Sequence, residues 1–144
     1  MTNGQDKAQA ILKDDRGLSM SVITDIILSV AVIEVGRLAE LEGFSVIDKI
    51  NDWLGDNDYD PLTRLDNLVE GRRILQACIY GGANNGFSLC DFIGCLESQK
   101  WRDRDRLQLF VKEENDERFS AYMFDRDGKI KKFWDGYDKM PEPL

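Results

Sequence analysis

The residues with the most suggestive spacing are aspartates in the first half of the chain. The run Asp56-Asn57-Asp58-Tyr59-Asp60 places carboxylates at alternate positions, as the opening of a calcium-binding loop does. The rest of that pattern fails, because its sixth position is Pro61 instead of glycine and its twelfth is Asn67 instead of glutamate. We therefore expect a polar connection and no bound metal ion.

Three of the aspartates also recur at helical spacing. Asp48, Asp52 and Asp56 are four residues apart, so a helix would place them along one face about 6 Å apart, comparable to phosphates along a strand. Such like charges destabilise a helix by about 0.2–0.5 kcal/mol per pair, so helix stability does not explain them.

Two interpretations of these aspartates stay open. They form either a solvated face that keeps the protein soluble or a surface that attracts the basic cleft of another protein. We call Asp48, Asp52, Asp56, Asp58 and Asp60 the acidic ridge. Tyr59 is a candidate aromatic anchor beside it, because binding hot spots favour tyrosine. The predicted partner-binding residues are therefore Asp48, Asp52, Asp56, Asp58, Tyr59 and Asp60.

The distribution of charge supports a basic protein as the partner. The net charge is −8, and residues 1–60 hold 12 acidic and 5 basic residues, whereas residues 101–144 hold 11 and 10. A strongly acidic first part disfavours direct binding to nucleic acid or to an anionic membrane.

The residue types do not indicate a catalytic, cofactor or metal site. The chain has no histidine, which excludes every catalytic arrangement that requires an imidazole. Its cysteines are odd in number and lack C-x-x-C spacing, so we expect buried free thiols in a reducing compartment. The glycine-rich run Gly81–Gly86 lacks the Lys-Ser/Thr pair of a phosphate-binding loop and is predicted to be a mobile connector. We expect no catalytic residue, no cofactor and no metal. The cysteines are Cys78, Cys90 and Cys95.

The elements that position the ridge are predicted to be helical up to about residue 98. The apolar core Ile26–Val35 of the stretch Ser19–Glu42 keeps helical spacing without a proline, so it is predicted to be a central helix. Ser45 with Asp48 predicts a capped helix start, and Gly55 is the expected residue just after that helix. Ser88 with Asp91 predicts a similar start. Further helices are predicted over Gln5–Lys13 and from Asp60-Pro61 to Ile79.

The C-terminal part changes to a strand pattern. We predict an antiparallel meander of Leu107–Lys112, Phe119–Phe124 and Lys129–Trp134, with a tight turn at Asp127-Gly128. The helix over Ile26–Val35 is expected to cover it. The predicted fold is thus α+β, with four to five helices packed on a three-stranded meander. It forms a single domain, 1–144, with a helical part over about 5–98, a β part over about 106–135 and a loose tail over 138–144.

A basic edge is the competing candidate surface. If Trp101–Arg106 is extended, its arginines share one side and, with Lys129, Lys131 and Lys132, lie near aromatic residues. Such a surface can bind single-stranded nucleic acid, but a core role for the aromatics and protection of a sheet edge by the charges are favoured.

Two short segments resemble known families. Arg73–Tyr80 resembles a helix segment of the phage DNA-mimic antirestriction proteins, which implies an inhibitor. The run Phe124–Ile130, followed by Phe133-Trp134-Asp135, resembles the closing hairpin of nuclear-transport-factor-like and polyketide-cyclase-like cone folds, which implies a domain that holds a ligand.

The sequence favours a small acidic protein that is not an enzyme and that neutralises a basic partner, with a nuclease as the expected class. An immunity protein of a toxin system and a phage-type antidefence protein, such as an antirestriction or anti-CRISPR inhibitor, fit equally well. The alternative is a small-molecule-binding or enzymatic cone-like domain. A cytoplasmic location is expected, since the N-terminus lacks a secretory pattern and the apolar run Val22–Ile33 is too short to span a membrane.

Overall fold

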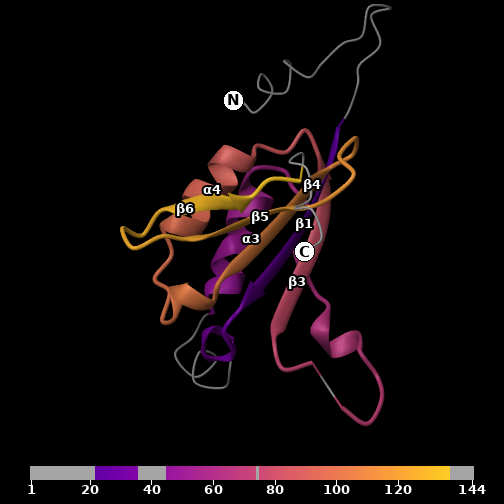
Figure 1. Ribbon diagram of the computed structural model, residues 1–144, viewed down its shortest axis with the longest axis vertical. Helices are drawn as coiled ribbons and strands as arrows, with labels where there is room; N and C mark the ends of the chain where they lie inside the picture. Colours follow the sequence, from indigo (N-terminus) through magenta and orange to yellow (C-terminus); the bar gives the residue numbers. More distant parts are fainter. Residues whose placement is uncertain (1–21, 36–44, 74, 137–144) are drawn as a thin grey trace, which may run out of the picture.

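The computed structural model describes residues 22–35, 45–73 and 75–136. Over these residues the chain forms one six-stranded antiparallel sheet in the order β2-β3-β1-β4-β5-β6. The two described α-helices, α3 and α4, lie on the same side of this sheet (Figure 1). In chain order the elements are β1 (Ile23–Val30), η1 (Val32–Glu34), α3 (Val46–Asp56), β2 (Thr63–Arg64), η2 (Asp66–Leu68), β3 (Cys78–Asn85), α4 (Leu89–Glu97), η3 (Arg104–Arg106), β4 (Gln108–Glu113), β5 (Ser120–Phe124) and β6 (Ile130–Trp134), where η marks a single 3₁₀ turn.

The predicted central helix is wrong, because Ile23–Val30 is the strand β1. Its burial alternates: Ile26, Leu28 and Val30 are buried, whereas the residues between them are half-buried or exposed. Alternation of this kind is the period of a strand, and the β-branched residues of the segment suit a pleated surface. Leu28 lies between Tyr80 on β3 and Leu109 on β4, so β1 is an inner strand of the sheet.

The helix predicted from Asp60 to Ile79 is also wrong. The segment forms β2, η2 and the start of β3, so the likeness of Arg73–Tyr80 to a helix of antirestriction proteins does not hold. Gly81 does not end a helix but lies inside β3, where a Cβ would come within 2.7 Å of the Leu65 side chain. The predicted mobile connector Gly81–Gly86 is therefore mostly strand.

Several local predictions are confirmed. Helices begin after Ser45 and Ser88, and the three C-terminal strands are present, with Gly128 in the left-handed conformation of their tight turn. They form half of a larger sheet instead of a separate meander, and α3 and α4 cover the sheet instead of the segment Ile26–Val35. The predicted helix Gln5–Lys13, the tail 138–144 and the ends of the stretch Ser19–Glu42 lie outside the described residues.

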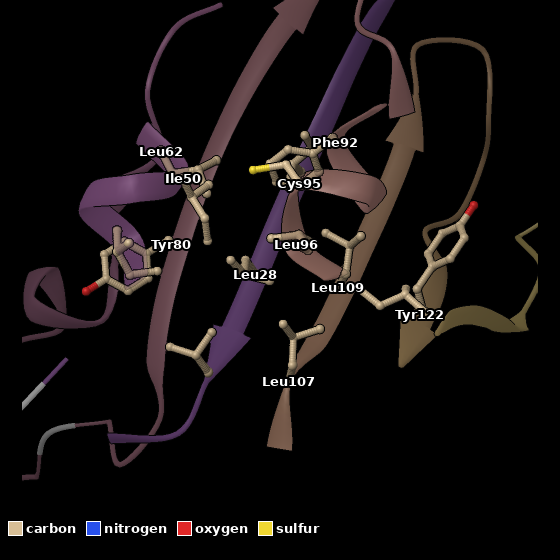
Figure 2. Packing of buried hydrophobic residues seen from close by; sticks show 14 of the residues in the cluster. Leu28, Ile50, Leu62, Tyr80, Phe92, Cys95, Leu96, Leu107, Leu109 and Tyr122 are labelled. Carbon is tan, nitrogen blue, oxygen red and sulfur yellow. The ribbon is translucent and has the colours of Figure 1, made fainter. Parts of the chain in front are cut away.

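The core fills the space between the sheet and the two helices (Figure 2). Ile50 and Leu54 of α3 and Phe92 and Leu96 of α4 are fully buried, as is Leu28 on the sheet. Burying a side chain of this size stabilises the fold by about 1.5–3 kcal/mol. These contacts fix α3 on the sheet, so its opposite face has a defined position at the surface. No helix within the described residues is both long enough and apolar enough to cross a membrane.

Candidate protein-binding surface

The α3 part of the acidic ridge lies on the face of the helix that points away from the core. Asp48, Asp52 and Asp56 are exposed, whereas Ile47, Ile50 and Leu54 of the same helix are buried. Asp48 also has a structural role, because its carboxylate accepts the Ser45 N–H at 3.4 Å while the Asp48 N–H donates to Ser45 Oγ at 3.2 Å. This reciprocal capping fixes the start of the helix.

The helix ends in a motif that holds Asp58 in an unusual backbone conformation. The Tyr59 N–H donates to the Leu54 carbonyl at 2.8 Å, and the Asp58 N–H donates to the Gly55 carbonyl at 3.1 Å. Asp58 has a φ of 63°, at the position of such a motif that glycine usually occupies. The predicted end of the helix at Gly55 is therefore too early. The motif places the Asp58 carboxylate just beyond the aspartates of α3.

Tyr59 is engaged inside the protein. Its ring centroid lies 4.7 Å from that of Phe87, and its hydroxyl accepts the Ser88 N–H at 3.0 Å and donates to the Gly86 carbonyl at 3.3 Å. These contacts join the loop after α3 to the start of α4. A role for Tyr59 in partner binding stays a prediction.

The last two aspartates of the ridge border a small hollow. Asp58 and Asp60 line it with Ile23, Ala83, Asn84 and Asn85, and its volume is about 320 Å³. Both aspartates are exposed. The ridge therefore continues from α3 to the end of the sheet where β1 begins and β3 ends.

The ridge keeps its negative charge. Within the described ranges, none of its five aspartates forms an ion pair, whereas cations of the C-terminal half pair with neighbouring acids, as in Arg106–Asp103, Lys131–Asp125 and Lys132–Asp135. Glu34, another acid of the first half, is buried and accepts the backbone N–H groups of Arg102 and Asp103. Of the acids in residues 1–60 that the structure describes, the exposed ones are thus those of the ridge.

The basic edge does not form as predicted. Arg104–Arg106 is a 3₁₀ turn instead of an extended segment, so the three arginines do not alternate along a strand. The Arg104 guanidinium carbon lies 5.8 Å from the centre of the Phe124 ring. On the edge strand β6, the Ile130 N–H donates to Glu97 Oε2 at 2.7 Å. This backbone N–H is therefore not available to pair with a strand of another molecule.

An ion pair between the exposed Arg64 and the buried Asp66, which the sequence did not indicate, lies at the opposite edge of the sheet. Arg64 Nε donates to Asp66 Oδ1 at 3.1 Å, and the Ile79 N–H donates to the same oxygen at 2.8 Å. Burial alone would raise the pKa of Asp66, but the hydrogen bonds from Arg64 and Ile79 outweigh burial and lower it. The ion pair joins β2 to η2, and the hydrogen bond from Ile79 ties η2 to β3. An i, i+2 Arg-Asp spacing offers no sequence signal that predicts the ion pair.

The two buried thiols are not activated in the way that a catalytic cysteine is. Burial raises the pKa of Cys78 and of Cys95, which keeps both thiols protonated, whereas an activated nucleophile has a lowered pKa. Cys90 is exposed, contrary to the expectation of three buried thiols. Among the described residues, no three acidic or cysteine side chains are grouped so that they could hold a metal ion.

A deep pocket lined by Tyr122, Trp134 and carboxylates would favour the alternative of a ligand-holding cone. Tyr122 is buried in the core. A larger hollow, of about 670 Å³, lies elsewhere, where β1 ends and β4 begins, and neither residue lines it. Comparison of the chain with protein-family models, with curated proteins and with solved structures gives no match.

Proposed function

We propose that this protein binds and neutralises a basic partner protein through the acidic ridge, with a nuclease as the expected class of partner. One observation carries the proposal: residues 48–60 present five exposed aspartates and a single lysine, and none of these aspartates has an ion-pair partner within the described part of the chain. Complementary charge speeds the encounter of two proteins and fixes their orientation.

The positions of Asp56 and Asp58 argue against a role for these two aspartates in folding. Acids near the C-terminus of a helix oppose the helix dipole, at a cost of about 0.3–1 kcal/mol each, yet the last turn of α3 carries Asp56 and no basic residue. Asp58 adds the cost of a left-handed conformation. Residues retained against stability in this way are typical of binding surfaces.

The ridge also suits occlusion of a nucleic-acid site. Asp52 and Asp56 are one helical turn apart, so their carboxylates project about 6 Å apart along the axis and suit lysines and arginines that otherwise hold phosphates. An immunity protein against a toxin nuclease and a phage antidefence inhibitor would use the same chemistry. Both settings belong to this proposal.

The proposal is tested with purified basic nucleases from toxin, restriction and CRISPR systems, each assayed for cleavage at a one-to-one ratio with this protein. For an inhibited nuclease, we expect the Kd to rise steeply as NaCl increases from about 50 to about 500 mM, because salt screens exposed charges. The double variant Asp52→Lys/Asp56→Lys should weaken binding by about 100-fold.

The matched control is Glu70→Lys/Glu117→Lys, which makes the same change in net charge at two exposed acids away from the ridge. We expect the Kd of this control to stay within about threefold of that of the unmodified protein, because substitutions far from a binding surface affect binding little. Binding that neither salt nor the ridge variant weakens, or equal losses in both variants, would refute the proposal.

A further inference from the structure

The loop that carries Asp58 and Asp60 is held by two asparagine side chains. Asn84 Oδ1 accepts the Asp60 N–H at 2.7 Å, and Asn84 Nδ2 donates to the Asp60 carbonyl at 3.3 Å. Asn51 does the same two residues later, where its Oδ1 accepts the Leu62 N–H at 2.8 Å and its Nδ2 donates to the Leu62 carbonyl at 3.3 Å.

A side-chain amide can pair with the backbone N–H and C=O of a loop residue, as a neighbouring strand would. It carries one acceptor and one donor group in the same arrangement as a peptide unit, so each asparagine satisfies both backbone groups of one loop residue. Residues 60 and 62 alternate as paired residues of a strand do. The loop is thus bound to β3 on one side and to α3 on the other before β2 begins.

Asn84 is itself held rigidly. Only 9% of its surface is exposed, and it lies in β3 opposite the buried Thr24 of β1. Tyr59 adds a third attachment through its hydrogen bonds to the loop before α4. Loops that lack such attachments pay conformational entropy when a partner orders them.

We infer that Asn84 and Asn51 are positioning residues, which hold the loop of Asp58 and Asp60 in one conformation so that the partner meets a pre-formed acidic surface. This inference rests on the proposed function. Neither asparagine needs to contact the partner. Loosening the loop leaves the charge unchanged, so the association rate constant should stay the same while the dissociation rate constant rises.

The first arm of the test needs no partner. Backbone amide exchange is measured by NMR on the full chain for the unmodified protein, Asn84→Ala and Asn51→Ala. We expect the Asp60 amide in Asn84→Ala, and the Leu62 amide in Asn51→Ala, to exchange at least about tenfold faster, while the amides of Ile26 and Leu109 keep their protection. Two variants in different elements guard against the failure of one to fold.

Asn85→Ala is the matched control, because Asn85 lines the same hollow but is exposed and has no side-chain hydrogen bond among the described residues. Its exchange rates should equal those of the unmodified protein. Fast exchange of the Asp60 amide in the unmodified protein, or no acceleration in either asparagine variant, would overturn the inference whatever the partner is.

The second arm measures binding to the nuclease that the inhibition assay identifies. Asn84→Ala should raise the dissociation rate constant about tenfold and change the association rate constant by less than about twofold, and Asn85→Ala should change neither. A looser loop with an unaltered dissociation rate constant would overturn the positioning role and leave the proposed function standing. A protected loop in a protein that binds no basic partner would instead refute the proposed function, and the inference with it.

Discussion

Asp58 shows at a single residue how stability and binding compete. Its φ of 63° is favourable for glycine and costly for other residues. We predict that Asp58→Gly raises the free energy of unfolding by about 0.5–1 kcal/mol, measured by urea denaturation, and weakens partner binding because one carboxylate is lost.

Asp58→Ala separates the two effects. It removes the same charge but keeps a Cβ, so it should weaken binding equally without the gain in stability. If Asp58→Gly proves less stable than the unmodified protein, its carboxylate contributes to folding, and its place on a binding surface loses this support.

Asp66 gives the protein a pH dependence that can be measured. Its pKa is lowered in the folded state by the hydrogen bonds of Arg64 and Ile79, so it contributes stability that is present above the ordinary pKa and lost as the pH falls through the folded one. We predict that Asp66→Asn lowers the free energy of unfolding by about 1–3 kcal/mol at pH 7.

The difference between Asp66→Asn and the unmodified protein should stay constant from pH 7 to about pH 5 and shrink below about pH 4. Asp105→Asn is a suitable control, because Asp105 is exposed and has no ion pair within the described residues. A difference that does not depend on pH would show that Asp66 acts only through its shape and hydrogen bonding.

The sequence predicts those elements whose signals are local. Ser45 and Ser88 mark helix starts because a cap involves residues only three positions apart, and Gly128 marks a hairpin for a similar reason. The sequence of β1 wrongly predicts a helix, because a run of almost uninterrupted apolar residues fits a period of 3.6 as well as a period of two. Its true partners, such as Tyr80 and Leu109 for Leu28, are far away in the chain.

The alternation of β1 predicts opposite results for two neighbouring apolar residues. Leu28 is fully buried beneath the helices, whereas Ile27 is half-buried on the other face of the sheet. We predict that Leu28→Ala lowers the free energy of unfolding by about 2–5 kcal/mol, and Ile27→Ala by less than half of that, in thermal or urea denaturation. Equal losses would contradict the assignment of the two residues to opposite faces.

At the scale of the whole molecule, the sequence predicts the acidic ridge but not the two asparagines that hold its loop in place. The aspartates are contiguous in the sequence, and a helical period alone places three of them on one face. Asn84 and Asn51 act through pairs with Asp60 and Leu62 that are 24 and 11 residues apart, so only the packing of β3 against α3 brings them together. Local patterns thus indicate which charges a surface carries, and the tertiary structure determines how rigidly they are held.

The balance of charge over the whole molecule leads to a prediction that requires no partner. Replacing Asp52 and Asp56 by lysine turns the repulsion between positions 48 and 52 into attraction. It also places a cation at position 56, near the C-terminus of the helix, where the helix dipole favours positive charge. The net charge changes from −8 by four units towards zero. We predict that this double variant is more stable by about 1 kcal/mol in about 20 mM NaCl, and that the gain shrinks in about 500 mM NaCl, as measured by urea denaturation.

The control is the variant Glu70→Lys/Glu117→Lys, which has the same net charge but carries its substitutions outside the helices. Its gain in stability should be smaller. If the ridge variant is less stable than the unmodified protein, the aspartates support folding. If it is more stable but binds the partner more weakly, the aspartates serve binding at the expense of stability.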